Sequence, residues 1–145
     1  MRTLSVLVFM CILCVMCISD NPESAPITPE GDNQDQILVI HFHMINQCTC
    51  CINAGKWAEE TVKLHFPEEY NHRTIVYMHV CIEENRDMVI QYNVYGPSLY
   101  INVVKNGNSN ITNAMQAWQH CHDYDTFVAV FTQMLEDALQ EIGST

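Results

Sequence analysis

Short apolar runs and amphipathic stretches follow one another from residue 36 onward. Residues 37–43 form a short run rich in β-branched side chains, which is typical of a buried strand. Similar runs over 74–81 and 98–104 predict two more strands. Residues 54–66 place apolar side chains at helical spacing with charged residues between them, and Pro67 follows. This pattern predicts an amphipathic helix that ends at the proline.

The last third of the chain predicts a hairpin and a long helix. The pair Asn106-Gly107 follows the third strand and favours a type I′ turn, after which residues 109–113 form a short return strand. Asp123 or Asp125 can then cap a helix whose apolar residues form one stripe almost to the C-terminus.

The predicted elements follow the order β-α-β-α-β-β-α, with a short second helix over 86–92. A strand–helix–strand unit favours a parallel pair joined by a right-handed crossover. The later hairpin adds an antiparallel strand. For residues 36–145 we therefore predict an α/β domain with a central mixed four-stranded sheet flanked by helices.

The first 35 residues differ from this domain in composition. Arg2 precedes an uncharged apolar run over residues 4–18, which is shorter than the roughly 20 residues that a relaxed membrane-spanning helix needs. We interpret residues 1–19 as a secretory signal peptide, or as an N-terminal anchor if they are not cleaved. Residues 20–35 hold three of the five prolines and read as a flexible acidic leader. The domain is thus expected to be exported: extracellular, periplasmic or on the outer face of the cytoplasmic membrane.

The net charge of the chain excludes some classes of binding partner. The 145 residues include 17 acidic and 6 basic side chains, for a formal net charge of −11. This balance argues against nucleic acid or an anionic membrane surface as the principal partner, and leaves the N-terminal segment as the only membrane contact expected. The composition also excludes a disordered chain, a coiled coil and a polytopic membrane protein.

The cysteines are numerous for a chain of this length. Three of the eight lie inside the apolar N-terminal run, and five remain in the expected mature chain: Cys48, Cys50, Cys51, Cys81 and Cys121. Because five is odd, at least one thiol is left unpaired, reactive, intermolecular or bound to a metal ion.

Cys48 and Cys51 form a C-x-x-C motif between the first strand and the first helix. At a helix N-terminus, free backbone N–H groups and the helix dipole favour a thiolate at the first cysteine. The second sulfur is near enough to close a small, reducible ring, as thiol–disulfide exchange requires. Zinc ribbons also use this motif, but they need a second such pair, which the expected mature chain lacks.

Three motifs together resemble the thioredoxin-like superfamily over about residues 37–142. They are the strand leading into Cys48-Thr49-Cys50-Cys51, the segment Val94-Tyr95-Gly96-Pro97-Ser98-Leu99 and the hairpin Lys105-Asn106-Gly107. The chain looks most similar to the small exported thioredoxin-like proteins labelled the nitrophenyl compound nitroreductase subunit ArsF family. That similarity rests on Phe42-His43 ahead of the C-x-x-C motif, with Trp118, Asp123 and Phe127 later in the chain.

This resemblance implies a thioredoxin-like fold and a thiol–disulfide oxidoreductase with a redox-active disulfide and no cofactor. Cys48 would attack a substrate disulfide and Cys51 would resolve the mixed disulfide. Gly96 and Pro97 would bind the substrate strand, with Pro97 in a cis peptide bond facing the sulfurs. The implied partners are protein disulfides or thiols and an unidentified redox partner.

The predicted topology places cysteine and histidine side chains that are distant in the sequence at the same edge of the sheet. The ends of two parallel strands would bring His43 and Cys81 to the sheet edge where the helix with Cys51 begins. The segment around Cys121 can return to the same edge before the last helix. His41 lies two residues before His43 and so on the same sheet face, and we interpret both as core histidines.

Other interpretations of the cysteines stay open. Cys48 and Cys51 are also compatible with a purely structural disulfide, and Cys81 with a stabilising bridge to Cys121. Cys50 is interpreted as a bystander thiol, with a role in disulfide shuffling as the alternative.

A metal site is the main alternative function. Cys50 and the segment His120-Cys121-His122 offer soft nitrogen and sulfur ligands suited to Cu(I) or zinc. On this hypothesis the chain is a copper- or zinc-binding thioredoxin-like protein without exchange activity. A non-catalytic interaction module is a third hypothesis.

Overall fold

The computed structural model describes residues 34–144. The predicted signal peptide over 1–19 and nearly all of the predicted leader over 20–35 lie outside the described residues. Within the described part, no helix combines the length and apolar character needed to cross a membrane.

Four strands and five helices make up the described part of the chain. In order they are β1 (Gln36–His43), α1 (Thr49–His65), α2 (Pro67–Asn71), β2 (Ile75–Cys81), α3 (Arg86–Gln91), β3 (Ser98–Lys105), β4 (Asn108–Asn113), α4 (Met115–Trp118) and α5 (Tyr124–Gly143). Prediction and structure agree on all four strands and three helices. The sequence pattern did not predict α2 or α4, which are only five and four residues long.

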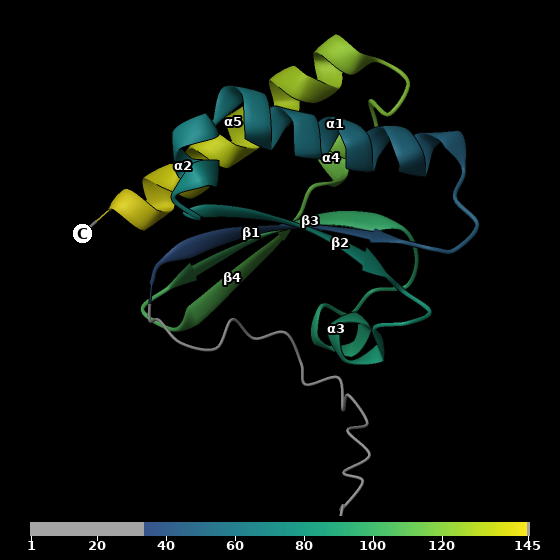
Figure 1. The fold of residues 1–145 in the computed structure, drawn as a ribbon, viewed down its shortest axis with the longest axis horizontal. Helices are drawn as coiled ribbons and strands as arrows, with labels where there is room; N and C mark the ends of the chain where they lie inside the picture. Colours follow the sequence, from purple (N-terminus) through teal and green to yellow (C-terminus); the bar gives the residue numbers. More distant parts are fainter. Residues whose placement is uncertain (1–33, 145) are drawn as a thin grey trace, which may run out of the picture.

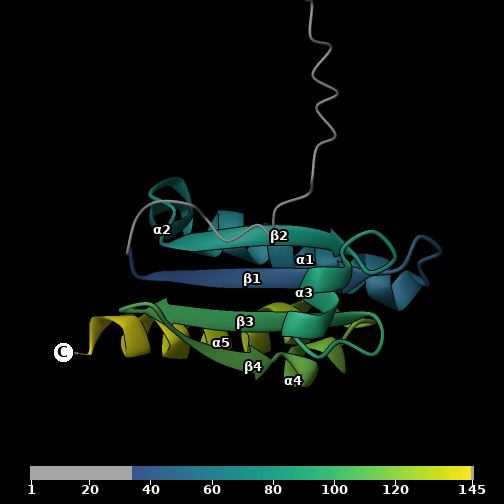
Figure 2. The same ribbon diagram turned by 90° about the horizontal axis from the view of Figure 1, so that it is seen from below.

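The strands form one mixed sheet in the order β2-β1-β3-β4 (Figure 2). β1 runs parallel to β2 and antiparallel to β3, and β4 runs antiparallel to β3. The predicted parallel pair and hairpin are therefore confirmed, and so is the thioredoxin-like fold class: a four-stranded mixed sheet flanked by helices. β1 is a central strand, and its carboxyl end leads into the loop before α1.

Helices cover both faces of the sheet. α1, α4 and α5 lie on one face, and α3 lies on the other (Figure 1). Alternate residues of β1 supply the two cores, as the two-residue period of a strand requires. Ile37 and Val39 pack under α1 and α5 with Phe127, while Ile40 and Phe42 belong to the core of the α3 face. His41 follows the same alternation and therefore lies on the α1 face.

Local signals explain where the elements begin and turn. Asn106 and Gly107 both have positive φ angles, 51° and 75°, as a type I′ turn requires, and glycine adopts such angles without steric penalty. Asp123 caps α5 by accepting a hydrogen bond from the backbone N–H of Thr126 at 3.2 Å. Pro67 is the first residue of α2, a position at which its missing N–H is not needed.

Candidate thiol redox site

Cys48 is an exposed free thiol at the N-cap position of α1. Its backbone is extended, and its carbonyl accepts the first helical hydrogen bond, from the N–H of Ile52 at 3.1 Å. The N–H groups of the first helical turn have no partner within the helix, so they favour negative charge next to it. The sulfur of Cys48 is thus solvent-accessible and close to the positive end of a 17-residue helix.

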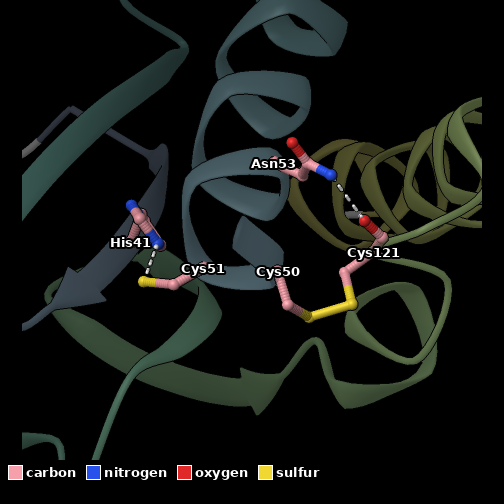
Figure 3. Close-up of a disulfide and its surroundings, with 5 residues drawn as sticks. All are labelled: His41, Cys50, Cys51, Asn53 and Cys121. Carbon is pink, nitrogen blue, oxygen red and sulfur yellow. Dashed lines mark hydrogen bonds between the residues drawn. A yellow bond between two sulfur atoms is a disulfide. The ribbon is translucent and has the colours of Figure 1, made fainter. Parts of the chain in front are cut away.

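Cys51 lies less than one helical turn further on and has no exposed surface. Its Sγ is 3.5 Å from Nε2 of His41, and its thiol donates to Oε1 of Gln47, also at 3.5 Å (Figure 3 draws the contact with His41). Burial, and secondly the charge of nearby Cys48, raise the pKa of the Cys51 thiol to about 11. Cys51 is therefore protonated at neutral pH, while Cys48 is the accessible member of the pair.

His41 is a buried imidazole in the middle of the α1 face. It is 1% exposed, and burial, followed by the nearby His79 and His43, lowers its pKa to about 3. The ring is therefore neutral at physiological pH. Its Nε2 contacts Cys51, whereas its Nδ1 has no hydrogen-bond partner.

Gly55 makes room for this ring within α1. A Cβ atom added at Gly55 would overlap the His41 imidazole, so any other residue at this position would displace it. The close approach of helix backbone and imidazole explains a glycine in the interior of a helix, where it is otherwise unfavourable. Gly55 is thus a positioning residue for the His41–Cys51 contact.

Three imidazoles stack along the sheet toward solvent. The rings of His41 and His79 are 5.0 Å apart and nearly parallel, and the rings of His79 and His43 are 3.9 Å apart. His79 is exposed and lies opposite His41 in the register of β1 and β2. A cleft of about 240 Å³ beside α1 is lined by His41, His79 and residues of α1 and β2, including Tyr77. The site is therefore open to solvent along this cleft, on the side of His79.

Cys50 forms a disulfide with Cys121, in the loop before α5 (Figure 3). The Cα atoms of the two residues are 5.1 Å apart. The side-chain amide of Asn53 donates to the carbonyl oxygen of Cys121 at 2.9 Å, which is a second link between the loop and α1. His122 adds a third candidate ligand, since its ring and the two sulfurs offer atoms within 4.8 Å of one another.

The structure corrects one expectation for the cysteines and excludes one alternative that the sequence left open. Cys50 is not a bystander thiol, because the loop before α5 brings Cys121 against the first turn of α1. For the same reason Cys81 does not bridge to Cys121. Cys81 is a free, half-buried thiol at the end of β2, and it donates to the Glu83 carboxylate at 3.4 Å. Burial, and secondly that contact, raise the pKa of Cys81.

Pro97 lies where the resemblance places it but not in the expected conformation. The described residues contain no cis peptide bond, so the predicted cis bond between Gly96 and Pro97 is wrong. The trans form is the ordinary preference of such a bond, by about 0.5–1 kcal/mol. Pro97 immediately precedes Ser98, which pairs with Phe42 near the end of β1. Gly96 and Pro97 therefore reach the sheet end at which β1 leads to the thiols.

The structure brings together most, but not all, of the residues predicted for the site. Cys48 and Cys51 are two thiols and not a disulfide, and His43 lies opposite Cys81 at the strand ends as expected. His120 is not part of the group of close ligand atoms at the disulfide. His79 was missed because the register between parallel strands cannot be inferred from either strand alone.

Comparison with known proteins adds little to this geometry. No protein-family model matches the chain, and no curated protein matches it. Among solved structures, a malarial protein is 15% identical with a TM-score of 0.42, covering 68% of this chain and 96% of that one. Human ERp44 in its zinc-bound form is 18% identical with a TM-score of 0.44, covering 64% and 27%. Chloroplastic thioredoxin z is 19% identical with a TM-score of 0.40, covering 63% and 80%.

The class of protein therefore follows from the molecule itself. The strand order β2-β1-β3-β4, with only β1 and β2 parallel, defines a thioredoxin-like fold. The thiols in the first turn of α1 and the disulfide beside them define a thiol site at the N-terminus of that helix.

Proposed function

We propose that the protein is a thiol–disulfide oxidoreductase that exchanges its Cys48/Cys51 dithiol with disulfides of protein substrates. One observation carries the proposal: exposed Cys48 caps α1, and buried Cys51 beneath it contacts the neutral imidazole of His41. This arrangement provides an accessible thiol that can attack a substrate disulfide and a shielded thiol that can resolve the mixed disulfide. Thiol–disulfide exchange requires both.

Cys48 carries the first step of the proposed reaction. Its thiolate attacks one sulfur of the substrate disulfide, a mixed disulfide forms, and the other substrate sulfur leaves as a thiolate that takes a proton from water. The sulfur lies at the N-terminus of α1, where the N–H groups of the first turn have no partner within the helix. Exposed Met44, Ile45 and Ile52 surround Cys48 in the sequence and offer apolar contacts to an unfolded polypeptide. Gly96 and Pro97 are the proposed contacts for the substrate backbone.

Cys51 carries the second step with the help of His41. The Cys51 thiol loses its proton and attacks the Cys48 sulfur, which forms the Cys48–Cys51 disulfide and releases the second substrate thiol. In the tautomer with its proton on Nε2, the neutral His41 ring can donate a hydrogen bond to the Cys51 thiolate as it forms, 3.5 Å away. The proton lost by Cys51 balances the proton that the released substrate thiolate takes up from water, and the cleft beside His41 and His79 is open to water. Each turnover reduces one substrate disulfide and oxidises one Cys48/Cys51 dithiol.

Export and a narrower family assignment belong to the same proposal. A disulfide such as Cys50–Cys121 persists in oxidising compartments, which supports an exported domain. The basic start and the apolar run over 4–18 support a signal peptide or anchor. Membership of the small exported ArsF-type group is proposed on the sequence motifs alone.

Reduction of insulin by the purified protein with a dithiol reductant tests the function. We expect Cys48→Ser to abolish catalysed reduction, because it removes the attacking sulfur. We expect Cys51→Ser to accumulate mixed disulfides on Cys48 that are visible by mass spectrometry, because resolution is blocked. Cys81→Ser is the matched control, since Cys81 is a free thiol outside the motif, and it should retain activity. Activity of the Cys48→Ser protein equal to that of the parent would overturn the proposal.

A further inference from the structure

The disulfide between Cys50 and Cys121 has a third ligand group beside it that the exchange reaction does not use. His122 is exposed, and its ring lies within 4.8 Å of both sulfurs. Within residues 34–144, this ring has no hydrogen-bond or ion-pair partner, so both of its nitrogens are available to other ligands. Two cysteine sulfurs and one imidazole nitrogen form a donor set of the kind that zinc binds in proteins.

The loop that carries Cys121 and His122 is held in place by more than the disulfide. The Asn53 amide donates to the Cys121 carbonyl at 2.9 Å (Figure 3). Within the loop, the N–H of Cys121 donates to Trp118 at 3.0 Å and the N–H of Asp123 donates to His120 at 2.8 Å. None of these bonds involves a sulfur atom. Reduction of the disulfide therefore leaves the two cysteines facing each other across the same gap.

The charges around this gap favour a cation. The loop between α4 and α5 has no lysine or arginine, Asp123 follows His122 directly, and Asp125 lies in the first turn of α5. Lys56, on the next turn of α1, is exposed and faces Glu60, with the ammonium group 3.7 Å from the carboxylate. Lys56 thus has an acidic partner of its own.

We propose that the Cys50–Cys121 disulfide is the closed form of a redox-gated zinc site, in which Cys50, Cys121 and His122 bind Zn²⁺ once the disulfide is reduced. A dithiol supplies two electrons and two protons to the sulfur–sulfur bond, is itself oxidised to a disulfide, and leaves two thiols on the protein. Zn²⁺ then displaces both thiol protons and binds two thiolates and the neutral imidazole. Water completes the fourth position, as at open zinc sites. Exchange with a disulfide, which takes back the two electrons and becomes a dithiol, re-forms the Cys50–Cys121 bond and expels the ion.

The distances allow this exchange with small movements. Ligand atoms around one tetrahedral zinc ion are roughly 3.3–3.8 Å apart, given metal–ligand distances of about 2.0–2.3 Å. The two sulfurs must separate from bonding distance, and the imidazole must approach by about 1 Å from its limit of 4.8 Å. Rotations of the Cys50, Cys121 and His122 side chains provide movements of this size while the backbone stays in place.

Zinc binding to the purified protein tests the proposal, with free Zn²⁺ as the probe. Protein reduced by a dithiol and freed of it without oxygen is compared with oxidised protein by competition against a chromophoric chelator. We expect one Zn²⁺ per chain in the reduced protein and none in the oxidised protein. His122→Ala should weaken binding at least tenfold, whereas His120→Ala, its neighbour outside the donor group, should leave the affinity unchanged. A Co²⁺ absorption spectrum should show thiolate ligation that is lost in Cys121→Ser.

The Cys48→Ser/Cys51→Ser protein separates this proposal from the proposed function. It keeps all three zinc ligands, so we expect full zinc binding without exchange activity. Loss of zinc binding in this variant would place the ion on the C-x-x-C motif and overturn the proposal. Undiminished binding in His122→Ala, or no binding by the reduced parent, would also overturn it. None of these three results would bear on whether Cys48 carries exchange.

Discussion

A neutral histidine in contact with a buried thiol is the residue-scale feature that distinguishes this site. His41 has lost nearly all contact with water, and only one of its ring nitrogens has found a partner. Burial of an ionisable group disfavours its charged form, so the ring stays neutral beside Cys51. The same burial has a consequence for the stability of the whole protein.

Stability should decrease with acid because His41 resists protonation in the folded state. In the unfolded chain a histidine binds a proton near pH 6.5, whereas in the folded protein the pKa of His41 is about 3. Between these values the unfolded state holds more protons, so the free energy of unfolding falls as the pH falls. The loss attributable to His41 should be about 2 kcal/mol between pH 7 and pH 5.

Urea denaturation of His41→Phe at several pH values checks this expectation. Phenylalanine is similar in size and does not titrate, so the variant should lose about 2 kcal/mol less than the parent over this range. His65→Gln, at an exposed position in the last turn of α1, is the control and should follow the parent. Parallel pH profiles for His41→Phe and the parent would contradict the assignment.

At the scale of elements, the contact between α1 and β1 depends on a glycine, Gly55, which has no side chain. Gly55 allows the helix backbone to lie directly on the His41 ring, and the backbone carbonyl of Gly55 also accepts a hydrogen bond from the Tyr77 hydroxyl at 2.9 Å. Helix and sheet are thus joined at this point by polar contacts and not by interdigitated apolar side chains.

Gly55→Ala should destabilise the protein, although alanine is the better helix former. The gain in helix propensity is about 1 kcal/mol, whereas forcing a methyl group into the His41 ring should cost about 1–3 kcal/mol and move the imidazole away from Cys51. Thermal unfolding and the rate of Cys51 alkylation measure both effects. Gly143→Ala, in α5 with open space around the added Cβ, should be neutral or stabilising. Equal responses of the two variants would show that Gly55 has no spatial role.

On the scale of the whole molecule, one covalent link joins distant parts of the chain. The Cys50–Cys121 disulfide spans 71 residues of sequence. A loop of this size restricts the unfolded chain strongly, so the disulfide should contribute about 4 kcal/mol to stability. The Cys50→Ser/Cys121→Ser protein should lose this amount in urea denaturation, and the parent under reducing conditions should match it. Cys81→Ser, which changes only an exposed thiol–carboxylate contact, should stay within about 0.5 kcal/mol of the parent. A loss below 1 kcal/mol for the double variant would contradict the expectation.

Most of the fold could be predicted from the sequence because its strands and long helices carry strong periodic patterns. The run over 37–43 and the apolar stripe of α5 were recognised for this reason, and Asp123 was one of the two predicted caps. The two short helices were missed because four or five residues are too few to show a period. Pro67 predicted the end of α1 correctly, but its second role as the first residue of α2 depends on tertiary packing.

The site was only partly predictable. The exposure of Cys48 and the burial of Cys51 follow from their positions on α1, so spacing alone indicated them. The partner of Cys50 depends on how the loop before α5 folds back, and no local pattern encodes that return. Likewise, Gly55 and His79 acquire their roles only when helix and strands meet at His41.

The disulfide also makes residues 50–121 a closed ring, and β1 lies outside it. β2 and β3 belong to the ring, yet they do not pair with each other; each pairs with β1, which lies between them. If Cys50 and Cys121 were oxidised before β1 docked, β2 and β3 would already be linked through the closed ring. The position of β1 between them would still be empty. β1 would then have to enter that gap between two strands already tied together. Productive folding is therefore expected to insert β1 first and oxidise the thiols afterwards.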